Sequence, residues 1–174
     1  CDSLNVWLAT YLEKYPADRK NFEKVMRTEF KYYRLLEANG IKSSRATFQE
    51  FSGEMLARLS EVIPDAEDDR VVYSPSYWRA VEVYVDYLRI EDPRKLQGRG
   101  DRIYENEVKL ATYFPKGAVR DKIAYTNLDN ILYWVRPDRR GYFDKCVKRL
   151  APRYADVLRG KLNKQDADRK ARKL

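Results

Sequence analysis

The sequence predicts an all-α protein, a single-domain bundle of about seven to eight helices that could also divide into two helical subdomains. Three observations predict it. Apolar residues recur at intervals of three and four along most of the chain, prolines and glycines interrupt this pattern, and a 44% hydrophobic fraction in 174 residues is enough to bury a core. No repeat of fixed period is present.

The first two helices follow from amphipathic stripes. Residues 3–15 carry the first stripe, which Pro16 ends, and residues 17–38 carry the second, with Gly40 placed to end that helix in a left-handed conformation. The inward side chains should be Leu4, Trp7, Leu8, Tyr11, Leu12 and Tyr15 in the first helix, and Phe22, Val25, Met26, Phe30, Tyr33 and Leu36, or their neighbours, in the second.

A third helix is expected over residues 48–61. Thr47 and Glu50 have the spacing of a capping box, and Phe51, Met55, Leu56 and Leu59 would face the core. Residues 63–70 follow as an acidic loop. Its carboxylates lack the glycine and the final glutamate of a calcium-binding loop, so a solvated linker is favoured over a metal site.

Residues 75–90 are predicted to form the next helix, capped by Ser74 or Ser76. The alternation of Val81, Val83 and Val85 is also typical of a strand, but the capping residue and the length of the segment favour a helix. Residues 91–101 contain Pro93, Gly98 and Gly100 among charges, which makes them the candidate hinge between two subdomains.

The remaining helices are expected at residues 103–113, from a cap at Thr126 or Asn127 to residue 135, and at 141–150 and 152–162. Residues 114–121 are expected to form a turn or a short helix. Residues 136–140 should form a turn. The helical domain would then cover residues 1–162, and residues 163–174 would be a basic C-terminal tail.

Positive charge is concentrated in the last third of the sequence. Residues 121–174 hold 15 Lys and Arg against 7 Asp and Glu, whereas residues 1–60 and 61–120 have net charges of +2 and −2. Such asymmetry favours a surface that meets nucleic-acid phosphates, an anionic membrane or an acidic protein partner. The alternative is a C-terminal helix whose cations only complement its dipole and keep it in solution.

The residues common in catalysis are scarce, so the sequence predicts no enzyme, no metal site and no cofactor. Histidine is absent, which removes the commonest general base and zinc ligand. The glycine-rich phosphate-binding and dinucleotide-binding motifs are absent as well. Cys146 lies among cations that favour a thiolate, but its spacing from Leu150 favours a core position.

The segment around residues 131–153 combines rings and cations, as nucleic-acid surfaces do. Tyr133 and Trp134 are expected to be mostly core, whereas Tyr142 should be free to stack. On one helix, Lys145, Lys148, Arg149 and Arg153 would form a continuous basic ridge. The candidate residues for binding DNA or RNA are Arg136, Arg139, Arg140, Tyr142, Lys145, Lys148, Arg149 and Arg153.

The predicted function is therefore a non-enzymatic helical module that contacts nucleic acid through its basic C-terminal third. The alternative is a protein-protein interaction module, an assembly subunit or an effector, because exposed Tyr, Trp and Arg also dominate protein interfaces. The sequence predicts neither the oligomeric state nor the particular partner.

The order of helices over residues 6–59, with "EANGI" after the second and "TFQEF" opening the third, resembles the helical core-binding domain of tyrosine recombinases. The resemblance covers about a third of the chain. That family's catalytic arginines, histidines and tyrosine form no recognisable set here, so the resemblance implies no site residue.

Two features bear on the compartment. The longest apolar run, residues 131–135, is far below the roughly 18 residues of a membrane-spanning helix. With only two cysteines, Cys1 and Cys146, a disulfide framework is excluded and a reducing, intracellular compartment is favoured. A lipoprotein processed at Cys1 is the minority alternative.

Overall fold

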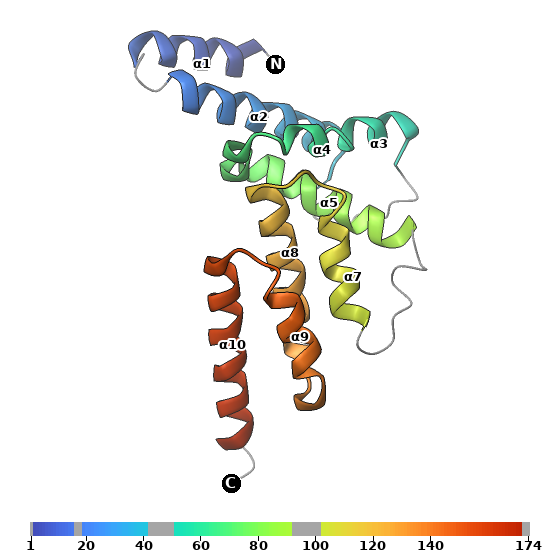
Figure 1. Ribbon diagram of the computed structural model, residues 1–174. Coiled ribbons are helices and arrows are strands. Elements are labelled where there is room, and N and C mark those ends of the chain that lie inside the picture. The colour runs from blue at the N-terminus through green and yellow to red at the C-terminus, as the bar shows by residue number, and fades with distance from the viewer. Residues whose placement is uncertain (1, 16–18, 42–50, 92–101, 172–174) are drawn as a thin grey trace. The chain divides into compact units, whose positions relative to one another are not determined.

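The computed structural model describes residues 2–15, 19–41, 51–91 and 102–171 (Figure 1). These ranges form α helices and short 3-10 segments without a strand, which confirms the all-α prediction. The chain divides into two compact units, which we call unit 1 (Cys1–Glu91) and unit 2 (Asp92–Leu174). Apart from Glu91, the predicted hinge at residues 91–101 lies outside the described residues.

Unit 1 contains five α helices and one 3-10 segment in its described part: α1 (Asp2–Lys14), α2 (Arg19–Ala38), α3 (Gly53–Leu59), α4 (Val62–Asp65), η3 (Asp69–Tyr73) and α5 (Pro75–Glu91). Helix α2 packs against α1, which precedes it in the chain, and against η3 and α5, which follow it. Leu8, Leu12 and Phe30 form the α1–α2 core, and Tyr32 meets Tyr77 edge to face between α2 and α5, with ring centroids 5.2 Å apart.

Helix α5 resolves the choice between helix and strand at residues 75–90. Val81, Val83 and Val85 are all buried, so their alternation reflects a helix covered on most sides rather than a strand with one buried face. Ser74 caps this helix, because its Oγ accepts the backbone N–H of Tyr77 at 3.1 Å. The prediction of a helix with a serine cap is confirmed.

The end of α2 follows the predicted glycine signal in detail. Gly40 has a φ of 62°, its N–H donates to the Glu37 carbonyl, and the N–H of Ile41 donates to the Leu36 carbonyl. These two bonds satisfy carbonyls that the helix end would otherwise leave without partners. Ile41 and Leu36 are both buried, so the chain leaves α2 directly into the core.

Several expectations in unit 1 need correction. Trp7 and Tyr15, expected to face inward, are exposed. Tyr33 is exposed too, and its neighbour Tyr32 is the buried ring. Residues 63–70 are not a loop, because they belong largely to α4 and η3. Helix α3 begins at Gly53, where the Oγ of Ser52 accepts the Met55 N–H at 3.1 Å; Thr47 and Glu50, the predicted caps, lie outside the described residues.

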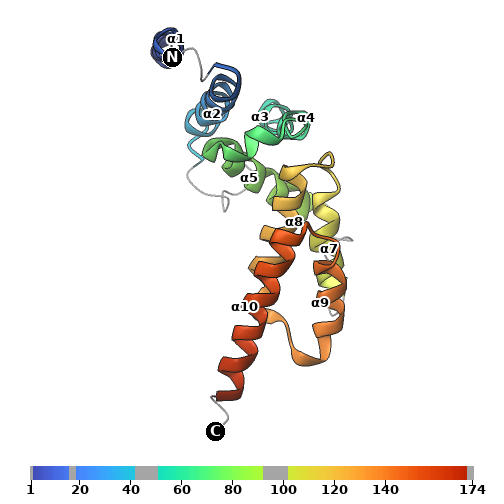
Figure 2. The same cartoon turned by 60° about the vertical axis from the view of Figure 1, so that its left-hand side comes forward.

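Unit 2 contains α7 (Arg102–Ala111), α8 (Ala118–Ile131), η4 (Leu132–Trp134), η5 (Pro137–Arg139), α9 (Arg140–Val147) and α10 (Pro152–Ala171). Helix α8 contacts both α7 and α10, as Figures 1 and 2 show. The core includes Phe143, which meets Tyr104 edge to face at 5.5 Å. The buried Asn127 side chain donates to the Glu107 carbonyl at 3.1 Å and joins α8 to α7.

Several predicted boundaries in unit 2 are wrong. Helix α8 begins at Ala118 after Gly117, so Thr126 and Asn127 lie inside the helix rather than capping it, and Asn127 is polar there because it satisfies a carbonyl of α7. Helix α10 continues to Ala171, so residues 163–171 are helix and not a separate tail. No helix in the described ranges is long and apolar enough to cross a membrane.

Candidate nucleic-acid interface

The two units differ sharply in charge. Unit 1 has 13 Lys and Arg against 16 Asp and Glu, a net charge of −3, whereas unit 2 has 22 against 11, a net charge of +11. The positive charge of the whole chain therefore belongs to unit 2. Unlike the division by thirds of the sequence, this division follows the folded units, so the excess charge belongs to one compact body.

All the predicted site residues lie in unit 2. Arg136 precedes η5, and Arg139 ends it. Arg140, Tyr142 and Lys145 belong to α9, Lys148 and Arg149 follow that helix, and Arg153 lies in the first turn of α10.

Arg140 joins secondary-structure elements rather than offering a free charge. Its guanidinium pairs with Asp166 and donates to Asn163 Oδ1 at 2.6 Å, so it links α9 to α10. Arg139 lies 3.8 Å from the carboxylate of its neighbour Asp138. These two arginines therefore have protein partners, and the candidate interface must rest on other cations.

Lys148, Arg149 and Arg153, which we call the corner cations, surround the junction between α9 and α10. All three are exposed and have no acidic partner among the described residues, and Leu150 is buried between them. The predicted ridge on one helix is wrong, because α9 ends at Val147 and the chain turns before α10 begins. The cations are instead brought together by the turn.

Two rings lie beside these cations. Lys145 Nζ lies over the exposed Tyr142 ring, 5.3 Å from its centroid, and the Arg153 guanidinium lies 4.6 Å from the centroid of Tyr154. Tyr142 is exposed, as predicted. Rings with attached cations present a flat surface and a positive charge at the same place.

The prediction that Tyr133 and Trp134 are mostly core is wrong. They are 75% and 70% exposed, not core, and their rings meet edge to face at 5.7 Å. Helix α8 ends at Ile131, and the three residues of η4 bury Leu132 while the next residue, Val135, is also buried. A 3-10 turn repeats every three residues, so burying residues 132 and 135 directs residues 133 and 134 outward.

Side chains of α10 hold this turn in place. The Arg169 guanidinium donates to the Val135 carbonyl at 2.8 Å and to the Tyr133 carbonyl at 3.2 Å, and Gln165 Nε2 donates to the Tyr133 carbonyl at 3.2 Å. The predicted tail is therefore the element that fixes the exposed rings. The spacing of Leu132 and Val135 gave no signal for this turn, because residues three apart share a face in an α helix as well as in a 3-10 turn.

Tyr125 and Tyr154 stack between α8 and α10, with centroids 4.8 Å apart. Lys161 Nζ lies 2.7 Å from Asp129 Oδ2 and 5.8 Å from the Tyr125 centroid. The hydrogen bond from Lys161 to Asp129 is the main cause that raises the pKa of this lysine, so its charge persists. Lys161 is thus occupied in joining α8 to α10.

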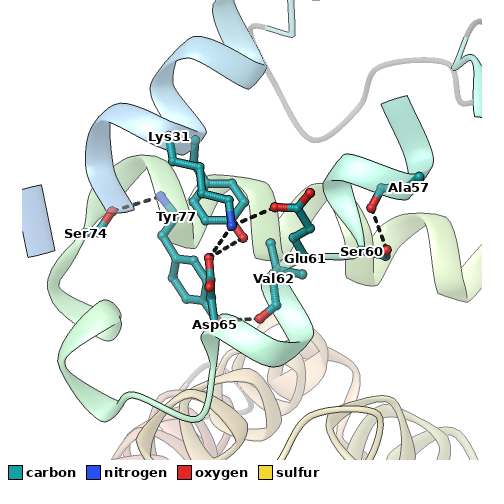
Figure 3. A network of polar contacts seen from close by, with 9 residues as sticks. Lys31, Ala57, Ser60, Glu61, Val62, Asp65, Ser74 and Tyr77 are labelled. Carbon is teal, nitrogen blue, oxygen red and sulfur yellow. Dashed lines mark hydrogen bonds and ion pairs between the residues drawn. The ribbon is translucent and has the colours of Figure 1, made fainter. Parts of the chain in front are cut away.

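The acidic segment of unit 1 also has structural partners. Lys31 Nζ lies 2.7 Å from Asp65 Oδ2 and 2.8 Å from Glu61 Oε2, as Figure 3 shows. The hydroxyl of Tyr32 donates to Asp65 at 2.9 Å, and that of Tyr77 donates to the Val62 carbonyl at 2.9 Å. The described residues contain no group of three or more potential metal ligands.

Burial is the largest cause that raises the pKa of the Tyr32 and Tyr77 hydroxyls, and the charge of Asp65 adds to it. Both hydroxyls therefore stay protonated and remain hydrogen-bond donors. Burial likewise raises the pKa of the Cys146 thiol, and outweighs the opposing charge of Arg149. The nearby cations thus do not make Cys146 a reactive thiolate.

Comparison of the chain with protein-family models, with curated proteins and with solved structures gives no match. The resemblance of residues 6–59 to the core-binding domain of tyrosine recombinases therefore remains a likeness of helix order.

Proposed function

We propose that unit 2 binds nucleic acid, with the corner cations and Lys145 as its phosphate contacts. The observation that carries the proposal is the exposure of these four cations, without acidic partners among the described residues, in a unit of net charge +11. Each phosphate that they neutralise would release counterions, which favours binding at low salt whatever the base sequence.

Charge reversal of the corner cations tests this proposal. A variant carrying Lys148→Glu, Arg149→Glu and Arg153→Glu should bind labelled DNA or RNA at least tenfold more weakly at low salt, measured by fluorescence anisotropy. If all three contact phosphates, the slope of log affinity against log salt should fall by about 2 to 3.

A matched control changes the net charge by the same amount in unit 1. Lys14, Arg19 and Lys24 are exposed there, and replacing all three with glutamate should leave binding within about threefold of the original. Equal losses in both variants would mean that only net charge matters and would contradict an interface at the corner. Absence of binding by the unmodified chain at low salt would reject the proposed function.

Helix α1 favours a second candidate function, binding of a protein partner. Val6 and Trp7 are exposed on this helix, and Tyr15 is exposed directly after it, although α1 also packs against α2. Exposed aromatic residues are common hot spots of protein interfaces. Trp7→Glu should then abolish recovery of one stoichiometric protein partner from nuclease-treated extract; recovery that is unchanged in this variant would rule out α1 as the contact.

A further inference from the structure

The Tyr133 and Trp134 rings are exposed in a way that the folding of unit 2 does not require. Their neighbours Leu132 and Val135 supply the core contacts of the turn, and both rings project from it at 75% and 70% exposure. Two large adjacent rings in water forgo the burial that usually stabilises such side chains. Their exposure is therefore better explained by a ligand than by stability.

The backbone that carries the rings is preorganised. Two carbonyls of the turn, those of Tyr133 and Val135, accept hydrogen bonds from Arg169, and the first also accepts one from Gln165. The turn also joins α8 to α9 in unit 2 (Figure 2). Because the turn is already held in place, binding a ligand to the rings costs little conformational entropy in the protein. Aromatic residues on a flexible chain terminus would have to be ordered first.

The charge beside the rings indicates which ligand fits. Arg136 follows the turn and Lys164 precedes Gln165 on α10; both are exposed and have no acidic partner among the described residues. Rings next to cations suit a nucleotide, whose base has a π face and whose phosphate is an anion. In a duplex the faces of the bases are covered by their neighbours, so only unpaired bases can stack on protein rings.

Helix α10 connects the rings to the corner cations. Lys164 lies eleven residues after Arg153, which is three helical turns, so the two cations share one stripe of α10 at about 16 Å separation. A strand with the stacked spacing of 3.4 Å per nucleotide covers that distance with about five nucleotides. One short strand could therefore contact the corner cations and the rings together.

We infer that Tyr133 and Trp134 form a base-stacking platform and that unit 2 binds single-stranded nucleic acid in preference to duplex. This inference rests on the proposed function, since the corner cations supply the phosphate contacts. The corner alone would bind single strands and duplexes through the same phosphates, whereas the platform adds a contact that only unpaired bases can make.

Removal of the rings tests the platform. The double variant Tyr133→Ala and Trp134→Ala should bind a 15-nucleotide oligothymidine about 5- to 150-fold more weakly, as expected for the loss of one stacked base or more, while duplex binding stays within twofold. Tyr133→Phe with Trp134→Phe keeps both rings and should restore most of the affinity. Tyr73→Ala is the matched control, because Tyr73 is 76% exposed but lies in unit 1.

Fluorescence supplies a second readout. The chain has three tryptophans, Trp7, Trp78 and Trp134, and stacking of a base on Trp134 should quench part of the emission. Trp134→Phe should remove that quenching on addition of the oligothymidine, whereas Trp7→Phe should not. A circular dichroism spectrum identical to that of the unmodified chain would show that the double alanine variant is folded.

The outcomes separate the two proposals. If the corner variant loses all binding while the ring variants keep their single-strand binding and quenching, the platform is overturned and the proposed function stands. Equal loss of duplex and single-strand binding in the ring variants would also overturn it. Loss of a stoichiometric protein partner from the ring variants, with nucleic-acid binding unaffected, would assign the rings to a protein interface instead.

Discussion

Unit 1 and unit 2 differ in the net charge that they carry and in the cations that they present to solvent. In unit 1, Lys31 joins α2 to Asp65 of α4, and Glu29 of α2 accepts hydrogen bonds from Ser74 and Ser76 at the start of α5. In unit 2, the corner cations point to solvent, and the net charge is +11 against −3 in unit 1. Ion pairs join helices in both units, since Arg140 and Lys161 do so in unit 2, but unit 2 also carries an excess of cations that is available to an anionic partner.

Aromatic residues lie both in the core and on the surface of the units. Tyr32 and Tyr77 of unit 1 are fully buried, and their hydroxyls have acceptors within the unit. Tyr133 and Trp134 of unit 2 are exposed on a turn whose backbone is held by α10. Each unit also contains the other kind, since Trp7 and Tyr73 are exposed in unit 1 while Tyr104 and Phe143 are buried in unit 2, so the sequence composition alone does not distinguish these uses.

The largest expected effect tests whether the two units are energetically separate. Phe143 is fully buried in unit 2, and Phe143→Ala should lower the free energy of unfolding of that unit by about 3–5 kcal/mol. Hydrogen exchange followed by mass spectrometry should show faster exchange in α8 and α9, with α2 and α5 unchanged. Equal acceleration in both units would mean that they unfold together.

A smaller effect is expected from removal of the buried Tyr77 hydroxyl in unit 1. Tyr77→Phe removes the hydrogen bond to the Val62 carbonyl and leaves that acceptor without its partner, at a cost of about 1–3 kcal/mol in the free energy of unfolding. Urea denaturation measures the change. Tyr73→Phe, at an exposed position of the same unit, is the control and should change stability by less than about 0.5 kcal/mol.

The smallest effect is the contribution of Lys31 to the free energy of unfolding, which is lost at alkaline pH. Burial lowers the pKa of Lys31, but hydrogen bonds and charges from Asp65 and Glu61 together outweigh it, so the folded pKa is raised above 10.5. The stabilisation is therefore complete below pH 10.5 and is lost as the pH rises through the folded value. Because the lysine is partly exposed, the contribution should be about 1 kcal/mol or less.

Lys31→Met isolates this contribution. The difference in the free energy of unfolding between the variant and the unmodified chain should be constant from pH 7 to pH 10 and shrink above that, as measured by urea denaturation at each pH. Tyrosine ionisation affects both proteins alike and cancels in the difference. A difference that grows with rising pH would contradict the assigned role of Lys31.

The helices of this chain could be predicted because their signals are local. Periodic apolar residues, the Ser74 cap and the glycine at position 40 each act within a few residues of the chain, and they predict the presence of the helices, the start of α5 and the end of α2. The start of α8 could not be predicted in this way. Asn127 has the character of a cap, but its partner is a carbonyl of α7, twenty residues earlier.

The sequence predicts which cations belong to the candidate site but not how they are placed relative to one another. Lys148, Arg149 and Arg153 were identified from charge, but the turn after Val147 that groups them requires the packing of α9 against its neighbours. Tyr133 and Trp134 were assigned to the core because they continue an apolar run. Their exposure depends on a 3-10 turn and on hydrogen bonds from α10, both of which lie beyond the helical pattern.

The hydrogen bonds from α10 to the turn also set an order of events during synthesis. Arg169 lies 34 residues after Val135, so at roughly 5–20 residues per second the ribosome adds the donor about 2 to 7 s after its acceptor. Until then the Val135 carbonyl has only water as a partner for this bond. The hydrogen bonds from Arg169 that hold the exposed ring pair can therefore form only after this residue has been added, so the turn is synthesised before the side chain that fixes it.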